Sequence, residues 1–173
     1  MEKRGNREQI VLATKVNAAR FIQAGYAIYD FIPKYTSNYM RGVSFNEVPQ
    51  KSLFVGNSIK SLHNSLNASL KKLRTDYVDI LYVHWWDYTC AVEEVMNGLH
   101  NLVAQGKVLY LGVSDTPAWI VSKANGYARM AGKTPFIIYQ GMWSIMERDF
   151  ERDILPMAIA EGKCGYDVVR LGG

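Results

Sequence analysis

The stretch from Tyr77 to Asp87 restricts the possible folds of this chain more than any other segment. Residues 78–83 are almost all apolar, and the run ends abruptly in His84, two tryptophans and a carboxylate. A near-continuous apolar run of this kind predicts a strand that is buried on both faces, as in a parallel sheet. Functional residues of α/β proteins stand where such strands end and loops begin. His84 is therefore the first candidate for a functional side chain.

Similar apolar runs alternate with amphipathic segments along much of the chain. Steps of three and four between apolar residues predict helices at 58–74, 92–105, 117–131 and about 150–161. Short apolar runs predict further strands at 10–16, 108–113 and 136–139. We expect the third helix to have Thr116 as its N-cap and Pro117 as its first residue.

This alternation of strands and helices predicts a parallel sheet with right-handed crossovers. A barrel and an open doubly wound sheet both satisfy the pattern. No GxGxxG or GxxxxGK[ST] motif follows any of the expected strands, so neither a Rossmann fingerprint nor a P-loop supports the open sheet. Residues 17–57 show no clear periodicity and are interpreted as one long loop, and residues 163–173 as a divergent tail.

Charge and cysteine content exclude several classes of protein. The 173 residues suffice for one domain, and the formal charge of +4 is mild. The basic residues are scattered, and the nearest to a cluster, Lys71, Lys72 and Arg74, indicates a solvated helix face rather than a nucleic-acid site. The two cysteines are far apart and form no CxxC, which predicts a reducing compartment, the cytoplasm.

The sequence also gives no sign of a membrane segment or a metal site. No apolar run is long enough for a signal peptide core or a membrane span. The three histidines and two cysteines lack the spacing of metal ligands. Cys90 follows the central strand, where a nucleophilic thiol is conceivable, but a structural cysteine is the better interpretation.

Polar side chains stand at the carboxyl end of every expected strand. They are Lys15, His84, Ser114 with Asp115, and Gln140. Each one alone is explained by contact with water or by capping of the next helix. If the strands are parallel neighbours, however, all of them lie on one rim. Together they would suit a flat, partly polar ligand between tryptophan walls, and a lysine with a histidine could stabilise negative charge on a carbonyl oxygen.

Four segments together resemble the aldo-keto reductases, most closely their fungal aryl-alcohol dehydrogenase branch, which includes the norsolorinic acid reductase-like proteins. The segments are IVLATK at 10–15, DILYVHWWD at 79–87, GKVLYLGVSDTPAW at 106–119 and IYQG at 138–141. The resemblance extends over roughly residues 8–162. It implies a (β/α)8 barrel that binds NADP(H) and transfers a hydride between the nicotinamide and an aromatic aldehyde or alcohol.

The resemblance also implies roles for individual residues. Lys15 and His84 match the catalytic lysine and histidine of the family. The positions that contact the nicotinamide carboxamide match Ser114, Asp115 and Gln140, and Trp85 matches a wall of the substrate pocket. No metal ion takes part in this chemistry.

The matched motifs correspond to about strands 3 to 6 of the family barrel, which predicts a single incomplete domain over residues 1–173. The family segments with the catalytic tyrosine and the phosphate-binding loops have no match, so we expect a truncated, catalytically impaired reductase. Open sheet edges also predict self-association. The alternative is a non-catalytic module that associates with a full-length relative. Nucleic acid and membranes are not expected partners.

Overall fold

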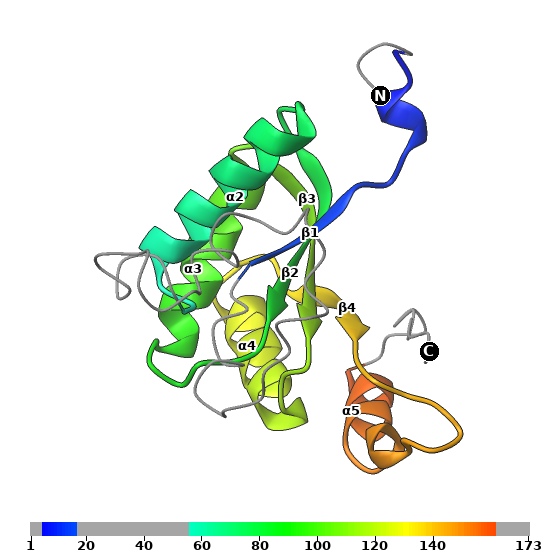
Figure 1. Ribbon diagram of the computed structural model, residues 1–173. Helices are drawn as coiled ribbons and strands as arrows, with labels where there is room; N and C mark the ends of the chain where they lie inside the picture. The colour runs from blue at the N-terminus through cyan, green and yellow to red at the C-terminus, as the bar shows by residue number, and fades with distance from the viewer. Residues whose placement is uncertain (1–4, 17–55, 162–173) are drawn as a thin grey trace, which may run out of the picture.

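Four parallel strands form the centre of the computed structural model, which describes residues 5–16 and 56–161 (Figure 1). They lie side by side in the order of the sequence: β1 (Ala13–Val16), β2 (Val78–His84), β3 (Val108–Ser114) and β4 (Phe136–Gln140). Every neighbouring pair is parallel. The proposed long loop, apart from its last two residues, and the proposed tail lie outside the described residues.

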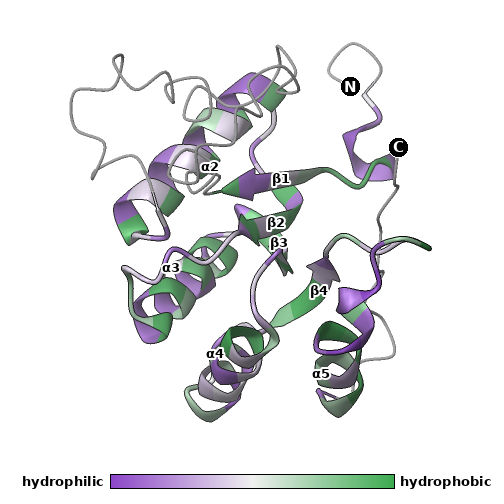
Figure 2. Cartoon of the chain, turned by 60° about the horizontal axis from the view of Figure 1, so that its bottom comes forward, coloured by the Kyte–Doolittle hydropathy of each residue, from purple (hydrophilic) through white to green (hydrophobic). Residues whose placement is uncertain are grey.

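A helix connects each strand to the next in the described part from β2 onward. The helices are α2 (Ile59–Leu73), which leads into β2, α3 (Val92–Ala104), α4 (Ala118–Met130) and α5 (Ile154–Ala160), which follows β4. Figures 1 and 2 show α2, α3 and α4 following one another along one side of the sheet, with α5 next to α4. This confirms the predicted α/β class and the partial (β/α)8 barrel.

The helices cover one face of the sheet, and the hydrophobic core lies between the sheet and the helices. Leu81 and Val83 on β2 are fully buried, as are Leu111 and Val113, which pair with them on β3. Each such side chain contributes about 1.5–3 kcal/mol by leaving water. Ser58 caps α2 by accepting a hydrogen bond from the Ser61 N–H with its side chain.

The opposite face, here called the inner face, is only partly covered. It carries the side chains that alternate with the buried ones along each strand. Ile80 and Tyr82 on β2 are half-buried, and Tyr110 on β3 is 52% exposed. The expectation that β2 is buried on both faces is therefore fulfilled on one face only, because the helices of the described part all lie on the other side.

Two expected boundaries were wrong for identifiable reasons. The first strand begins at Ala13 rather than residue 10, because the Asp79 carboxylate accepts the Leu12 N–H and Arg7 binds the Ile10 carbonyl. The last helix begins at Ile154, after a 3₁₀ turn at Asp149–Glu151. This start places Pro156 in the first turn, where its missing N–H costs little.

The N-cap expected at Thr116 was also wrong. Pro117 occupies the cap position of α4, and the Thr116 hydroxyl instead donates to the Ser114 carbonyl at 3.1 Å. Asp153 accepts a hydrogen bond from Ala118 N–H at 3.4 Å. The longest described helix, α2, has 15 residues, and no helix of residues 5–16 and 56–161 is long and apolar enough to cross a membrane.

Candidate functional site

The pairing register of the sheet brings the predicted polar residues together at one end. His84 pairs with Ser114, and Ser114 pairs with Gln140, so the last residues of β2, β3 and β4 lie at one level. Lys15 on β1 pairs with Tyr82, which lies two residues before His84 on β2. We call Lys15, His84, Ser114, Asp115 and Gln140 the carboxyl rim. It lies at the end of the sheet where active sites of (β/α)8 barrels occur.

Four members of the carboxyl rim form a continuous series of polar contacts. Lys15 Nζ donates to Ser114 Oγ at 3.4 Å, and Ser114 Oγ donates to Asp115 Oδ2 at 3.3 Å. His84 Nε2 lies 3.1 Å from the same carboxylate oxygen. Ser114 is 1% exposed, whereas the Asp115 side chain is 36% exposed. The series therefore runs from a buried hydroxyl to a carboxylate that solvent or a ligand can reach.

Lys15 stands above the ring of Tyr82, with Nζ 5.8 Å from the ring centroid. A Cβ at Gly112 would come within 2.6 Å of that ring, so glycine allows Tyr82 to lie flat across β3. By surface area Lys15 is exposed, yet desolvation by the surrounding atoms lowers the pKa of its ammonium, and the Asp115 carboxylate opposes this by raising it. The ammonium is the part of the side chain that lies beside the sheet, over the Tyr82 ring.

Asp115 owes its position to an unusual turn after β3. Its φ of +48° lies in the left-handed region, and its N–H donates to the Gln140 carbonyl at 3.1 Å. The buried Tyr139 hydroxyl donates to the Thr116 carbonyl at 2.7 Å and accepts from the Thr116 N–H at 3.1 Å. β4 thus fixes both residues that flank the Asp115–Thr116 peptide.

Trp85 lies beside His84. The two ring centroids are 6.1 Å apart and the rings meet edge to face. The φ of Trp85 is +70°, which is rare for a bulky residue. The geometry is compatible with the predicted role of Trp85 as a wall next to the imidazole.

The structure thus joins Lys15, His84, Ser114 and Asp115 through side-chain contacts, and it joins Gln140 to them through its backbone. Sequence reasoning missed Tyr82 and Tyr139. The signal for Tyr82 was available, because a residue two before His84 shares its face of the strand. The contact of Tyr139 with Thr116 depends on pairing between β3 and β4, and no local pattern indicates it.

Cys90 and the two remaining histidines lie apart from the carboxyl rim contacts. Burial raises the pKa of the Cys90 thiol, with Asp87 and Glu94 adding to the effect, so the thiol is protonated at neutral pH. His63 is exposed and contacts Asn67, and His100 contacts Thr134. Within residues 5–16 and 56–161, no three His, Cys, Asp or Glu side chains are arranged to bind a metal ion.

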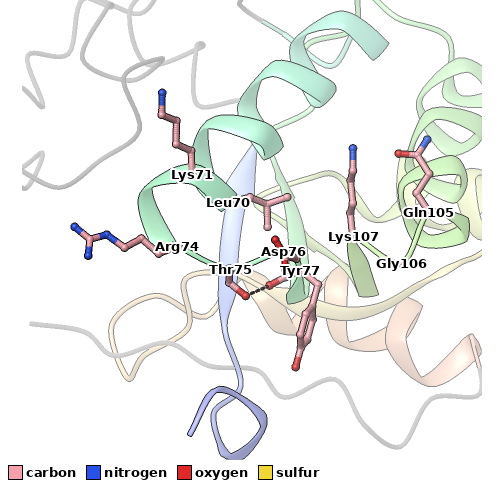
Figure 3. A pocket seen from close by; sticks show the side chains of 9 residues that line it. All are labelled: Leu70, Lys71, Arg74, Thr75, Asp76, Tyr77, Gln105, Gly106 and Lys107. Atoms are coloured by element: carbon pink, nitrogen blue, oxygen red, sulfur yellow. Dashed lines mark hydrogen bonds between the residues drawn. The ribbon is translucent and has the colours of Figure 1, made fainter. Parts of the chain in front are cut away.

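A hollow of about 640 Å³ lies at the other end of the sheet, where β2 and β3 begin (Figure 3). The end of α2 and the turn between α3 and β3 line it. Figure 3 shows Lys71, Arg74 and Lys107 spread along its border without converging on one point. None of the carboxyl rim residues lines this hollow. We place the candidate site at the carboxyl rim, because the side chains there contact one another.

Comparison with known proteins identifies the family of the chain. A profile described as "Aldo/keto reductase family" matches residues 1–169. The chain is 64% identical over 162 residues to "Aryl-alcohol dehydrogenase [NADP(+)]" of Phanerodontia chrysosporium, covering 94% of this chain and 37% of that protein. It is 54% identical to norsolorinic acid reductase A of Aspergillus parasiticus and 50% identical to norsolorinic acid reductase B of Dothistroma septosporum, each over 94% of this chain and 36% of the relative.

The chain therefore spans little more than a third of the length of these relatives, and the matched third includes the four strands and the carboxyl rim. A parallel sheet with helices on one side and a family profile that covers nearly the whole chain lead to the same conclusion. The chain belongs to the aldo/keto reductase family.

Proposed function

We propose that this chain carries the nicotinamide-binding part of an NADP-dependent oxidoreductase that interconverts aromatic aldehydes and alcohols. The observation that supports this most directly is the series of contacts from Lys15 through Ser114 and Asp115 to His84. The relative with 64% identity is an aryl-alcohol dehydrogenase that uses NADP(+), which suggests the cofactor and the substrate class. The low cysteine count is the basis on which we also propose a reducing compartment, the cytoplasm.

The polar groups of the carboxyl rim fit the carboxamide of a nicotinamide ring. A carboxamide donates through its NH2 group and accepts through its oxygen. The Ser114 hydroxyl would be a donor on turning its proton from Asp115 to the ligand, the Asp115 carboxylate is an acceptor, and the Gln140 amide can be either. When bound, NADPH supplies the hydride, while the protein orients the ring and stabilises charge.

Lys15 and His84 are the residues that would act on the substrate oxygen. Reduction of a carbonyl places negative charge on that oxygen, and a nearby ammonium or imidazole N–H stabilises it. The His84 side chain is 14% exposed, so water is largely excluded around the imidazole. Burial lowers the pKa of Lys15, against the opposing effect of Asp115, and this brings proton release by Lys15 nearer to neutral pH. Trp85 would support the aromatic ring of the substrate.

Oxidation of NADPH in the presence of benzaldehyde tests this proposal. We expect slow turnover in the purified chain and its loss in His84→Ala, because the imidazole would contact the reacting oxygen. His63→Ala is the matched control, since His63 is exposed on α2 and should leave the rate unchanged. The measured rate also tests the expectation that catalysis is impaired. Absence of NADPH-dependent turnover, or equal rates in the wild type and His84→Ala, would contradict the proposal.

A second candidate function is association with a full-length relative or with another copy of this chain. The partly exposed inner face, with Tyr110 as its most accessible aromatic residue, favours this candidate. Co-purification of the tagged chain with an untagged full-length relative distinguishes the two functions. An enzyme should bind NADPH by itself, whereas an interaction module should retain the relative at equal stoichiometry.

A further inference from the structure

Trp85 has a backbone conformation that the neighbouring chain must enforce. In a regular strand, His84 and Trp85 would point to opposite faces of the sheet. The φ of +70° at Trp85 reverses this alternation, so that the two rings meet edge to face. Such a conformation costs on the order of 1–3 kcal/mol and persists only where surrounding contacts determine it. The contacts that determine it are therefore part of how the site is built.

The backbone N–H and the backbone carbonyl of Trp85 both take part in hydrogen bonds. Its N–H donates to the Ser114 carbonyl at 3.0 Å, and its carbonyl accepts from Asn57 Nδ2 at 3.4 Å. The first bond continues the pairing between β2 and β3. The second comes from outside the sheet, because Asn57 precedes the first turn of α2. Asn57 is thus the residue that fixes the carbonyl after the reversal.

Asn57 and Asp87 bind each other reciprocally. The Asn57 N–H donates to Asp87 Oδ2 at 2.6 Å, and the Asp87 N–H donates to Asn57 Oδ1 at 3.2 Å. Asp87 Oδ1 also accepts from the Thr89 N–H at 2.9 Å. Asn57 is fully buried. The pair therefore closes the turn that follows β2 onto the start of α2, with Asn57 out of contact with water.

Gly56 makes room for this pair. Its φ is +91°, and a Cβ at this position would collide with the Asp87 carboxylate. Both the positive φ and the lack of space for a Cβ therefore require glycine at this position. Gly56 and Asn57 thus both fit against Asp87, which lies thirty-one residues after Gly56 and thirty after Asn57.

We propose that Asn57 and Asp87 are positioning residues that fix the Trp85 indole beside His84 and thereby give the site its preference for flat aromatic substrates. The preference rests on the proposed reductase function, whereas the positioning of Trp85 does not. Neither Asn57 nor Asp87 is required to touch the substrate. Their effect is transmitted through the backbone of Trp85.

The substitution Asn57→Asp tests the proposal with little change in size. It keeps the oxygen that accepts the Asp87 N–H, but it replaces the donor to the Trp85 carbonyl by an acceptor. Asn125→Asp is a matched control. Asn125 is equally buried and binds the Phe136 backbone reciprocally, at 2.9 and 3.3 Å, and its amide is 3.3 Å from a carboxylate of Glu161. Both variants thus place a second carboxylate in a buried site, but only one contacts Trp85.

Fluorine NMR of protein labelled with fluorotryptophan gives a readout that needs no activity. The chain has four tryptophans, and the spectrum of Trp85→Phe identifies the Trp85 signal. We expect Asn57→Asp to move the Trp85 signal and Asn125→Asp to leave it in place. Asp87→Asn, which keeps one oxygen to accept the Asn57 N–H, should move the same signal and serves if Asn57→Asp does not fold. An unmoved Trp85 signal in the folded variant would overturn the positioning role.

Kinetic measurements test the preference for aromatic substrates separately from the positioning of the Trp85 indole. We expect Asn57→Asp to lower kcat/KM for benzaldehyde about fivefold to tenfold relative to hexanal, mainly through KM, because the contact with an aromatic substrate is lost. The ratio should stay unchanged in Asn125→Asp. A moved Trp85 signal with an unchanged ratio would overturn the role in substrate preference. If the wild type has no NADPH-dependent activity, the proposed function fails, but the NMR spectrum still decides the positioning of Trp85.

Discussion

At the scale of single residues, Arg7 and Asp79 attach the first described segment to the sheet. Arg7 Nη2 donates to Asp79 Oδ2 at 2.7 Å, and the Leu12 N–H donates to the same oxygen at 2.8 Å. The guanidinium also lies 3.9 Å from the centroid of the Tyr77 ring. Burial by itself would raise the pKa of the Asp79 carboxyl, but the bonds from Leu12 and Arg7 outweigh it and lower the pKa. The charged form of Asp79 therefore stabilises the folded chain.

We expect Asp79→Asn to lower the free energy of unfolding by about 1.5–3 kcal/mol at neutral pH, the range for hydrogen bonds to charged groups. Because the folded-state pKa is lowered, this contribution is present above the ordinary pKa of an aspartate and is lost as the pH falls through the folded-state value. Urea unfolding across the acidic range measures it. Asp149→Asn is the control, since its ion pair with Arg152 is more than 80% exposed and should contribute nothing measurable. A difference between wild type and Asp79→Asn that does not shrink at low pH would contradict this explanation.

At the scale of the elements, β2 divides its side chains between a covered face and a partly open one. Leu81 is fully buried against the helices, and Ile80, its neighbour, is half-buried on the inner face. The core between the sheet and the helices α2 to α4 therefore supplies most of the hydrophobic stabilisation of the described part.

We expect Leu81→Ala to lower the free energy of unfolding by about 2–5 kcal/mol, the range for large-to-small substitutions in a packed core. Ile80→Ala removes a similar volume from the same strand but should cost less than half as much, because its side chain retains contact with water. Urea denaturation of both variants gives the comparison. Equal losses would show that the inner face is as well covered as the helix-facing side.

At the scale of the whole molecule, the described sheet has two outer strands and a partly exposed inner face. Within residues 5–16 and 56–161, β1 and β4 each pair with a neighbour on one side only. Unpaired strand edges and exposed aromatic residues favour association with other chains. The proposed self-association follows from both features.

We expect the apparent mass in size-exclusion chromatography with light scattering to rise with protein concentration. Tyr110→Lys should reduce this rise, because it places a charge on the inner face where Tyr110 is 52% exposed. Met130→Lys is the control, since Met130 is 85% exposed on α4, away from the inner face. An apparent mass that stays at the monomer value, or an equal effect of both substitutions, would contradict self-association through the inner face.

What the sequence predicted depends on how far apart the interacting residues lie. The limits of α2 were predicted to within one residue, because its cap and apolar stripe are local. The carboxyl rim was predicted although Lys15 and Ser114 lie far apart, because parallel pairing brings all strand ends together. The start of β1 was missed because it depends on Asp79. The reversal at Trp85 was missed because it depends on Asn57, and no local pattern links these residues.

The central claim is that the carboxyl rim accommodates the nicotinamide of NADP(H), and NMR of the histidine side chains tests it most directly. The chain has three histidines, and only His84 lies at the carboxyl rim. Titration with NADP+ should shift the imidazole signals of His84 and leave those of His63 and His100 in place, whether or not turnover is fast. Unchanged His84 signals at saturating NADP+, or shifts at His63 or His100 alone, would contradict the claim.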